Sequence, residues 1–258
     1  MQEKQAAWHW QWAKFKDDSR QLFEEWIQPH TLEVFRDCTV VDAGCGGGQH
    51  TSFVAPMARR VYAIDLNTVA LARERNRAFK NVCFVEGDLA SVTLPEPADV
   101  IFCIGVIHHT ADPAATFANL KTLVRPGGLM IVWCYSREGN FLNRWLVEPA
   151  KTLLLRRCPR SALVALAWTL TVLLHPIVHT LYRLPLFFLP YYQYFANWRR
   201  LTLARNMLNV FDKLNAPVTH FIPRKEIERW FAPDVFEDLH IHDYVGVSWH
   251  ASGRIRKI

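Results

Sequence analysis

Acidic side chains are missing from Pro149 to Phe211, where neither Asp nor Glu occurs in this 258-residue sequence. The same segment carries eight Lys and Arg residues, which exceeds the net charge of +6 of the whole chain. The rest of the chain is therefore slightly acidic, and the basic segment is also the most apolar one. Because nucleic-acid-binding faces are basic and polar, this combination argues against a nucleic-acid partner.

Cysteine pairs at metal-binding spacing are also absent, since none of the six cysteines forms a Cys-x-x-Cys motif. Several of them lie in apolar, strand-like runs, which is typical of buried thiols in a reducing compartment and argues against disulfides or a zinc site. Two histidine pairs, His175 with His179 and His240 with His242, have spacings that occur in metal sites. Pro176 and the lack of a nearby acid weaken the first pair, and both pairs are interpreted as packing or surface histidines.

The N-terminal stretch MQEKQAAWHWQW has no basic start, apolar core or small-residue cleavage site of a secretory signal. A cytoplasmic location is therefore expected. Half of the residues are apolar and 21% are charged, a globular composition without internal repeats or low-complexity runs. The length fits one α/β domain with an insertion as well as it fits two domains.

Apolar runs that predict strands alternate with segments of helical spacing between residues 15 and 136. The strand-like runs are TVVDAG, RVYAIDLN, NVCFVEGD, ADVIFCIGVIHHT and LMIVWCYS. The predicted helices are residues 15–36 and the segments HTSFVAPMAR, TVALARERNRAFK and PAATFANLKTLV. This alternation predicts a doubly wound α/β sheet with parallel neighbours and right-handed crossovers.

The loop after the first predicted strand, VVDAGCGGGQHT, contains four glycines within five positions. It lacks the Gly-Lys-Ser/Thr ending of a phosphate-binding P-loop. It also lacks the last glycine of the dinucleotide fingerprint Gly-x-Gly-x-x-Gly, because that position is Gln49. What remains is an acid, Asp42, followed by the alternating glycines Gly44, Gly46 and Gly48.

Acids stand at the ends of three successive predicted strands, at Asp42, Asp65 and Asp88. A carboxylate at the first position repels a pyrophosphate and attracts a ligand with a cationic amino acid portion. Asp65 is placed to accept from both hydroxyls of a ribose, and Asp88 from an exocyclic amine. The three acids therefore predict a site for a cationic nucleoside. The structural alternative is that each is only a turn or cap residue.

Five motifs in order and in register give the chain a family resemblance. VVDAGCGGG, VYAIDLN, VEGDLA, ADVIFCIGVIHH and LVRPGGLMIVW resemble those of class I S-adenosylmethionine-dependent methyltransferases, in particular small-molecule enzymes similar to quinone-biosynthesis methyltransferases. The resemblance covers Thr39 to Tyr135 and is looser over the last forty residues, where PRKEIERWF resembles the family's late helix. The runs around VFEDLHIHDY and VGVSWH resemble its closing antiparallel strand pair.

This resemblance implies a Rossmann-like, doubly wound and mostly parallel seven-stranded sheet. A helical, apolar insertion lies between the fifth strand and the last helix. Residues 1–136 would form N-terminal helices and the cofactor-binding core. Residues 137–220 would form the insertion, as a substrate lid or a membrane-interface element, and residues 221–258 the final helix and closing strands. The implied cofactor is S-adenosylmethionine, and the implied activity is methyl transfer.

The resemblance also implies roles for individual residues. Asp42 would lie near the methionine amino group, Asp65 would hold the ribose hydroxyls, and Asp88 would take the adenine amine. Gly44, Gly46 and Gly48 would line the methionine portion and the ribose, and Ile104 and Gly105 would lie beside the methionine. Leu66 would pack on the adenine face, and the backbone N–H of Leu89 would donate to the adenine ring.

A base assists methyl transfer when the acceptor is a hydroxyl or a carbon acid, although positioning supplies most of the catalysis. His108 and His109, at the end of the fourth predicted strand, are the candidates. In an extended segment one of the two would have to point away from the site. The structural alternative is that a histidine here only hydrogen-bonds the loop.

The insertion contains Ser161 to Tyr182, 22 residues without a charge. Three interpretations stay open: a membrane span, an interfacial or re-entrant hairpin held by flanking arginines and aromatics, and an apolar lid or dimer face. The first two imply an apolar or lipid-linked acceptor and peripheral contact with an anionic membrane, at its inner face. Trp8, Trp10 and Trp12 either join that interface or pack on the sheet.

Two functional classes follow. The favoured one is O- or C-methylation of an apolar or lipid-linked small molecule at the cytoplasmic membrane surface. The other is a non-catalytic methyltransferase-like module that binds membrane or a protein partner. The acceptor and the oligomeric state stay open at this point.

Overall fold

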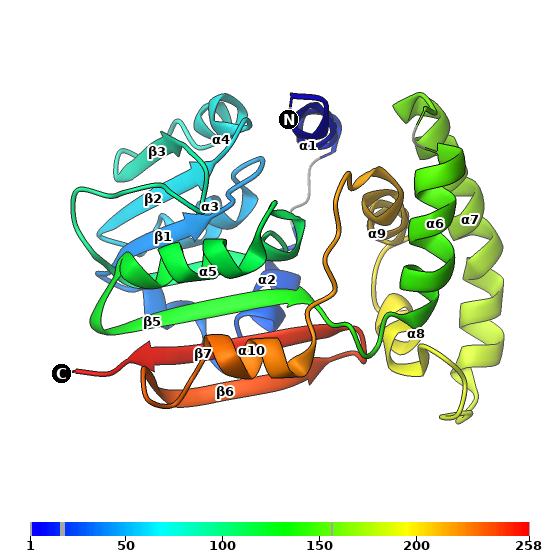
Figure 1. Ribbon diagram of the computed structural model, residues 1–258. Helices are drawn as coiled ribbons and strands as arrows, with labels where there is room; N and C mark the ends of the chain where they lie inside the picture. Colours follow the sequence, from blue (N-terminus) through cyan, green and yellow to red (C-terminus); the bar gives the residue numbers. More distant parts are fainter. Residues whose placement is uncertain (1, 16–18, 156, 258) are drawn as a thin grey trace. The chain divides into compact units, whose positions relative to one another are not determined.

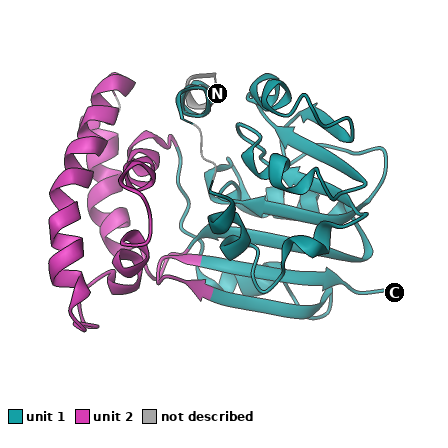
Figure 2. Cartoon of the chain, turned by 180° about the vertical axis from the view of Figure 1, so that it is seen from behind, with its two compact units in different colours: residues 1–135, 218–242, 249–258 teal, residues 136–217, 243–248 magenta. Residues whose placement is uncertain are grey.

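The computed structural model describes the chain except for residues 1, 16–18, 156 and 258 (Figure 1). It divides into two compact units, which are coloured separately in Figure 2. Unit 1 comprises Met1–Tyr135, Val218–His242 and Trp249–Ile258, and unit 2 comprises Ser136–Pro217 and Asp243–Ser248. The roles assigned to residues 1–136, 137–220 and 221–258 from the sequence stay predictions, because compactness alone does not assign a role.

A seven-stranded sheet organises unit 1, with the strand order β3-β2-β1-β4-β5-β7-β6. The strands are β1 (Thr39–Ala43), β2 (Arg60–Asp65), β3 (Val82–Glu86), β4 (Ala98–Ile104), β5 (Val124–Tyr135), β6 (Phe236–Tyr244) and β7 (Ser248–Ile255). The first five run parallel, and β7 runs against its neighbours (Figure 1). The chain reverses its strand order at β1 and β4, which confirms the predicted doubly wound, Rossmann-like fold.

The central strands are buried on both faces, which is why they read as continuous apolar runs. All five residues of β1 are buried, and successive side chains point to opposite faces. Val40 packs on one face with Phe102, and Val41 packs on the other with Ile101. The alternation along β1 and β4 thus supplies two cores, one on each side of the sheet.

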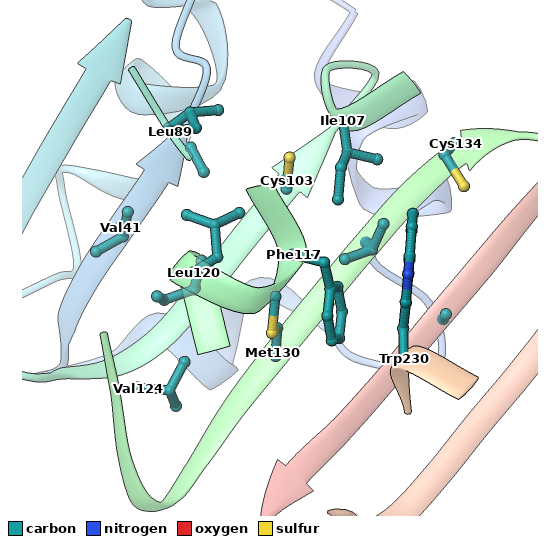
Figure 3. Packing of buried hydrophobic residues seen from close by; sticks show 14 of the residues in the cluster. Val41, Leu89, Cys103, Ile107, Phe117, Leu120, Val124, Met130, Cys134 and Trp230 are labelled. Carbon is teal, nitrogen blue, oxygen red and sulfur yellow. The ribbon is translucent and has the colours of Figure 1, made fainter. Parts of the chain in front are cut away.

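Helices cover both faces. On one face, α5 (Pro113–Thr122) and α10 (Arg224–Trp230) place Phe117 and Trp230 in stacked contact, with ring centroids 5.1 Å apart. Figure 3 shows this core around Phe117, Leu120 and Met130. On the other face, α2 (Arg20–Trp26), the 3-10 turn η1 (Leu32–Phe35) and α3 (Gln49–Val54) bury Phe23. The remaining helices of unit 1 are α1 (Gln2–Lys14) and α4 (Val69–Arg75).

Several predicted boundaries were wrong, since α3, α4 and β4 all end earlier than the predicted segments, and two further differences are explained by proline and glycine. The helix predicted over residues 15–36 is divided into α2 and η1, with residues 16–18 outside the described part. Pro29 explains the division, because proline has no N–H donor and also disfavours the helical conformation of the preceding residue. Strand β5 begins at Val124, five residues before the predicted run LMIVWCYS, and includes the RPGG sequence. Gly127 has a φ of +76° there, and the pairing of β4 with β5 shifts register between Ala98 and Val100.

Unit 2 is helical except for its share of the β6–β7 connection. Its elements are the π-helical turns η3 (Asn143–Val147) and η4 (Lys151–Leu155), which flank α6 (Glu148–Ala150), followed by α7 (Arg160–Thr180), the 3-10 turn η5 (Leu181–Arg183), α8 (Tyr192–Trp198) and α9 (Leu203–Asn215). Long-range packing within the unit joins α7 to α9. Most of this helical unit lies in Pro149–Phe211, the segment that lacks acidic side chains, although α6 begins at Glu148 and α9 contains Asp212.

Candidate functional site

The glycine turn follows β1 directly and leads into α3. Gly44, Gly46 and Gly48 all have positive φ, at +88°, +53° and +82°. A Cβ atom on Gly44 would lie 2.4 Å from Cγ1 of Val106, so a larger residue does not fit. The backbone N–H groups of Gly44 and Cys45 donate to the carbonyl of Ile64 on β2. The turn is thus held against the ends of both β2 and β4.

Asp42 is almost fully buried beneath this turn, with 2% of its surface exposed. Thr51 on α3 donates its hydroxyl to the Asp42 carboxylate at 2.6 Å. Burial raises the pKa of the Asp42 carboxyl to about 7, and the nearby charge of Asp65 adds to this while the Thr51 hydrogen bond opposes it. In the described chain no Lys, Arg or His forms an ion pair with Asp42.

Asp65 connects the end of β2 to the glycine turn. Its Oδ2 accepts from the Gly46 N–H at 3.0 Å, and its Oδ1 accepts from the N–H groups of Asn67 and Thr68. The Thr68 hydroxyl returns a hydrogen bond to the Gly46 carbonyl at 2.6 Å. Oδ1 already accepts two hydrogen bonds, but Oδ2 accepts only one and has a second lone pair, so Asp65 retains acceptor capacity for a ligand at Oδ2. Leu66 follows with 41% of its surface exposed.

The end of β3 carries Asp88 and Leu89. Asp88 is exposed, and its Oδ1 accepts from the Ala90 N–H at 2.9 Å, as expected for a turn residue. The Leu89 side chain is buried in the core shown in Figure 3. Its backbone N–H has no acceptor among the described residues. This leaves one backbone donor beside the exposed carboxylate.

The end of β4 meets both the glycine turn and β5. Ile104 is buried, and the Gly105 N–H donates to the Trp133 carbonyl at 3.0 Å. Gly105 has a φ of +76°, where the chain leaves the strand direction. The next residue is Val106, whose side chain lies against Gly44. Because β3, β2, β1 and β4 are parallel neighbours, all the predicted cofactor residues lie at one edge of the sheet.

His108 and His109 lie in a 3-10 turn, η2 (Ile107–His109), and not in an extended segment. The extended segment from which that argument started was therefore wrong, because the chain turns after Gly105. Their ring centroids are 4.1 Å apart. His108 is buried, with its ring centroid 4.3 Å from that of Tyr135.

His109 is partly buried, and its Nδ1 lies 2.7 Å from the carbonyl oxygen of Val218. A carbonyl oxygen only accepts, so Nδ1 carries the proton and Nε2 carries the lone pair of the neutral ring. The segment that contains Val218 is further held by the His220 N–H, which donates to the His108 carbonyl at 2.7 Å. The geometry therefore fixes the tautomer of His109.

Several residues at this edge were missed from the sequence. Thr51 lies inside the quoted glycine motif, but a hydroxyl that serves a buried acid has no spacing signal of its own. Trp8 on α1 places its ring centroid 4.8 Å from that of His109. Arg75 on α4 donates to the carbonyl of Trp12 at 2.6 Å. Of the two alternatives for the tryptophan cluster, Trp8 and Trp12 pack within unit 1.

Neither a reactive thiol nor a metal-binding cluster is found at this site among the described residues. The six cysteines are free thiols, and burial raises the pKa of Cys45, within the glycine turn, well above its usual range. That thiol stays protonated at neutral pH. Among the described residues, no group of three or more His, Cys, Asp and Glu is arranged to hold a metal ion.

Comparison with known proteins shows which family and which fold the core resembles. Residues 41–132 match a family model described as a methyltransferase domain. A ubiquinone biosynthesis O-methyltransferase of Paraburkholderia phytofirmans is 35% identical over 109 residues, which cover 40% of this chain and 46% of the relative. A probable S-adenosylmethionine-dependent methyltransferase of Mycolicibacterium smegmatis is 35% identical over 94 residues, 36% of each chain. The chain thus matches less than half the length of these curated relatives.

Among solved structures, a methyltransferase from Aquifex aeolicus whose description states S-adenosylmethionine dependence is similar over 95% of this chain and 96% of its own. The TM-score is 0.52 and the sequence identity is 14%, so this similarity concerns the fold alone. The matches cover the five motifs from which the family resemblance was inferred, and they confirm it. The family-model match ends at residue 132, before unit 2 begins.

Proposed function

We propose that this chain binds S-adenosylmethionine and transfers its methyl group to a small-molecule acceptor, because residues 41–132 match a methyltransferase domain model and curated relatives of this part are S-adenosylmethionine-dependent methyltransferases by name. The observation that carries the proposal is the buried carboxylate of Asp42 beneath the glycine turn. A buried carboxylate that is hydrogen-bonded by Thr51 but has no ion pair among the described residues is stabilised by a cation. The ammonium group of the cofactor's methionine portion supplies one, so the residues present fit the cofactor.

The other contacts follow from the same edge of the sheet. Asp65 has acceptor capacity for the ribose hydroxyls, and Leu66 offers an exposed apolar surface to the adenine. Asp88 accepts from the adenine amine, and the Leu89 N–H donates to the adjacent ring nitrogen. The remaining contacts are those of Gly44, Gly46, Gly48, Ile104 and Gly105, through backbone atoms beside the methionine.

When bound, the cofactor supplies a methyl group on a positively charged sulfur. The contribution of the chain is to orient the acceptor, exclude water and remove a proton. The Nε2 lone pair of His109 accepts the proton that a hydroxyl or carbon acid releases. The Val218 carbonyl keeps the ring in the tautomer that this step needs. His108 is more deeply buried against Tyr135, which supports a role in packing beside His109, although it stays a second candidate.

An apolar acceptor is favoured by the surface of unit 2. Sixteen large apolar side chains are exposed among the described residues, and all but Leu66 belong to this unit. The most exposed are Trp145, Leu153, Phe187 and Phe188, each with at least 75% of its surface accessible. Monomeric proteins in water rarely expose apolar side chains so densely. Such a surface supports an acceptor that is itself apolar or lipid-linked.

The protein would encounter an acceptor of this kind at a membrane surface. One helical stretch, Arg160–Arg183, is long and apolar enough to cross a membrane by length and composition. Only 22% of its most apolar window is buried, unlike the core helix of a globular unit. Arg160 and Arg183 at its two ends match anionic headgroups, which favours a helix lying in the interface. We therefore propose peripheral binding to an anionic, cytoplasmic membrane face.

Transfer of a labelled methyl group tests the proposal. Methyl-tritiated S-adenosylmethionine and the protein are incubated with a cell extract, and the label is recovered in organic solvent if the acceptor is apolar. A non-catalytic module that binds only membrane or a protein partner would give cofactor binding without transfer, or neither.

A further inference from the structure

We propose that α1 is a latch over the cofactor turn and the base, and that Arg75 holds this latch through the backbone of Trp12. The inference rests on the proposed cofactor site. It assigns positioning roles to Trp8, Trp12 and Arg75, three residues outside the methyltransferase motifs. Two of them come from α1, which precedes the matched residues 41–132 altogether.

The contact between Trp12 and the glycine turn is the first observation. A Cβ atom built on Gly46 would lie 2.9 Å from the indole Nε1 of Trp12, so the indole lies directly on the Gly46 backbone. Gly46 is also the residue whose N–H donates to Asp65. The indole therefore covers the part of the turn that connects the proposed methionine and ribose contacts.

Arg75 supplies the connection between the helix and the turn. Its NH2 donates to the Trp12 carbonyl at 2.6 Å, near the carboxyl end of α1, and its NH1 donates to the Gly47 carbonyl at 3.4 Å. A Cβ atom on Gly47 would lie 2.2 Å from NH1 of this guanidinium group, so the side chain lies against the turn. A charged donor is well suited to a helix carboxyl end, where the carbonyl dipoles point outward.

Trp8 extends the same face of α1 to the candidate base. Residues 8 and 12 are one helical turn apart and therefore share a face. Ala7 and Gln11, next to them on that face, are buried, whereas His9 is exposed. The Trp8 ring lies 4.8 Å from the His109 ring at an angle of 51°. One helix face thus touches both the cofactor turn and the proton acceptor.

This geometry has a kinetic consequence. While α1 is docked, Trp12 shields the glycine turn from water and Trp8 limits the movement of the His109 ring. Cofactor exchange then requires the release of α1, so the latch slows dissociation of the cofactor and of its product. A helix that closes over a site in this way lengthens the time for which the cofactor stays bound and excludes water. It thereby helps to position the reacting groups.

Dissociation of S-adenosylhomocysteine, followed by stopped-flow fluorescence on the full chain, tests the inference. The variants Trp12→Ala and Arg75→Gln are each expected to raise the dissociation rate by about tenfold, as weakened contacts act mainly on dissociation. The matched controls are Arg73→Gln on the same helix, whose guanidinium lies over Phe84, and Trp10→Phe on the other face of α1, whose ring packs on Phe15. Both are expected to stay within about twofold of the wild type.

This experiment distinguishes failure of the proposed latch from failure of the proposed cofactor site. If the wild type does not bind S-adenosylhomocysteine, the cofactor site itself is contradicted. If it binds, and either Trp12→Ala or Arg75→Gln dissociates no faster than the controls, the latch is contradicted and the cofactor site stands. Because a misfolded variant also loses ligand, the melting temperature of each ligand-free variant is measured in parallel. Recovery of slow dissociation in Arg75→Lys, which keeps a charged donor, supports the assigned role.

Discussion

The Nδ1 atom of His109 lies 2.7 Å from the carbonyl oxygen of Val218, a residue 109 positions later in the chain. This hydrogen bond orients an imidazole at the edge of the sheet where β1, β2 and β4 end. It also determines which nitrogen holds the lone pair. A long-range contact that fixes a tautomer is a typical preparation for proton transfer.

Removal of this imidazole tests its role as a base. The variant His109→Ala is expected to lower kcat by about 10²–10⁴-fold, the usual contribution of a general base. Its Kd for S-adenosylhomocysteine is expected to stay that of the wild type, because no cofactor contact is assigned to the ring. Single-turnover rates and titration calorimetry measure the two quantities. Unchanged turnover in both His109→Ala and His108→Ala would exclude a histidine base.

The pH dependence of cofactor binding reports on Asp42. Burial raises the pKa of its carboxyl to about 7, and binding of an ammonium group requires the anion. Affinity for S-adenosylhomocysteine is therefore expected to fall below about pH 7, by up to about tenfold per pH unit. Calorimetry between about pH 8 and about pH 5 measures this slope. Asp42→Asn is the control and is expected to bind weakly without a pH trend. A flat wild-type profile would argue against the contact.

The pH dependence of stability reports on a second buried group, His250 on β7. Burial lowers the pKa of His250 from 6.5 to about 4, with His242 adding to this and Glu25 opposing it. The unfolded chain then takes up a proton near pH 6.5, whereas the folded chain does so only near pH 4. The contribution of His250 to the free energy of unfolding is therefore fully present above about pH 6.5, the pKa of this side chain in the unfolded chain. It is lost as the pH falls, by at most about 1.4 kcal/mol per pH unit.

Asp42 acts in the opposite sense, because its pKa is raised from 3.8 to about 7 by folding. The folded chain binds that proton first, so this contribution is lost as the pH rises toward 7. Compared with the wild type between about pH 6.5 and about pH 4, His250→Asn is expected to lose less stability on acidification and Asp42→Asn to lose more. Urea unfolding measures both differences. Parallel curves for all three proteins would contradict the burial of these groups.

Membrane binding depends on the charge and the apolar surface of unit 2. The wild type is expected to sediment with anionic vesicles and to be released by salt, which screens headgroup attraction over about 10 Å. The triple variant Arg157→Gln, Arg160→Gln, Arg183→Gln is expected to stay in the supernatant. The charge-matched control in unit 1 is Arg20→Gln, Arg77→Gln, Arg224→Gln, which removes three exposed arginines and is expected to sediment normally. Equal sedimentation of the two variants would contradict an interfacial role.

The sheet and the cofactor edge were predictable from the sequence because their signals are local. Glycines that need positive φ, such as Gly44 and Gly48, follow a buried strand directly, and Asp65 ends the next strand. Parallel topology then brings these residues to one edge without further information. The family resemblance added residue roles, and the geometry brings the residues concerned to this same edge.

The rest depended on contacts between distant segments. The turn that groups His108 with His109 begins at Gly105, and nothing in the apolar run around it marks the end of the strand. The carbonyl of Val218 carries no side-chain signal at all. Trp8 and Trp12 had two open interpretations because an amphipathic helix pattern does not name the surface it covers. Pro29 is itself a sequence signal for the break after α2, because proline has no N–H donor and disfavours the helical conformation of the residue before it.

The most direct measurement is the recovery of label from methyl-tritiated S-adenosylmethionine after incubation with an extract that contains membranes. The account predicts label in the organic-solvent phase with the wild type, and none with Asp65→Ala, which removes the hydrogen bond to the Gly46 N–H in the glycine turn and those to Asn67 and Thr68 after β2. Label that enters only the aqueous phase would contradict an apolar acceptor. No transfer by a wild-type protein that binds the cofactor would contradict the proposed methyltransferase activity.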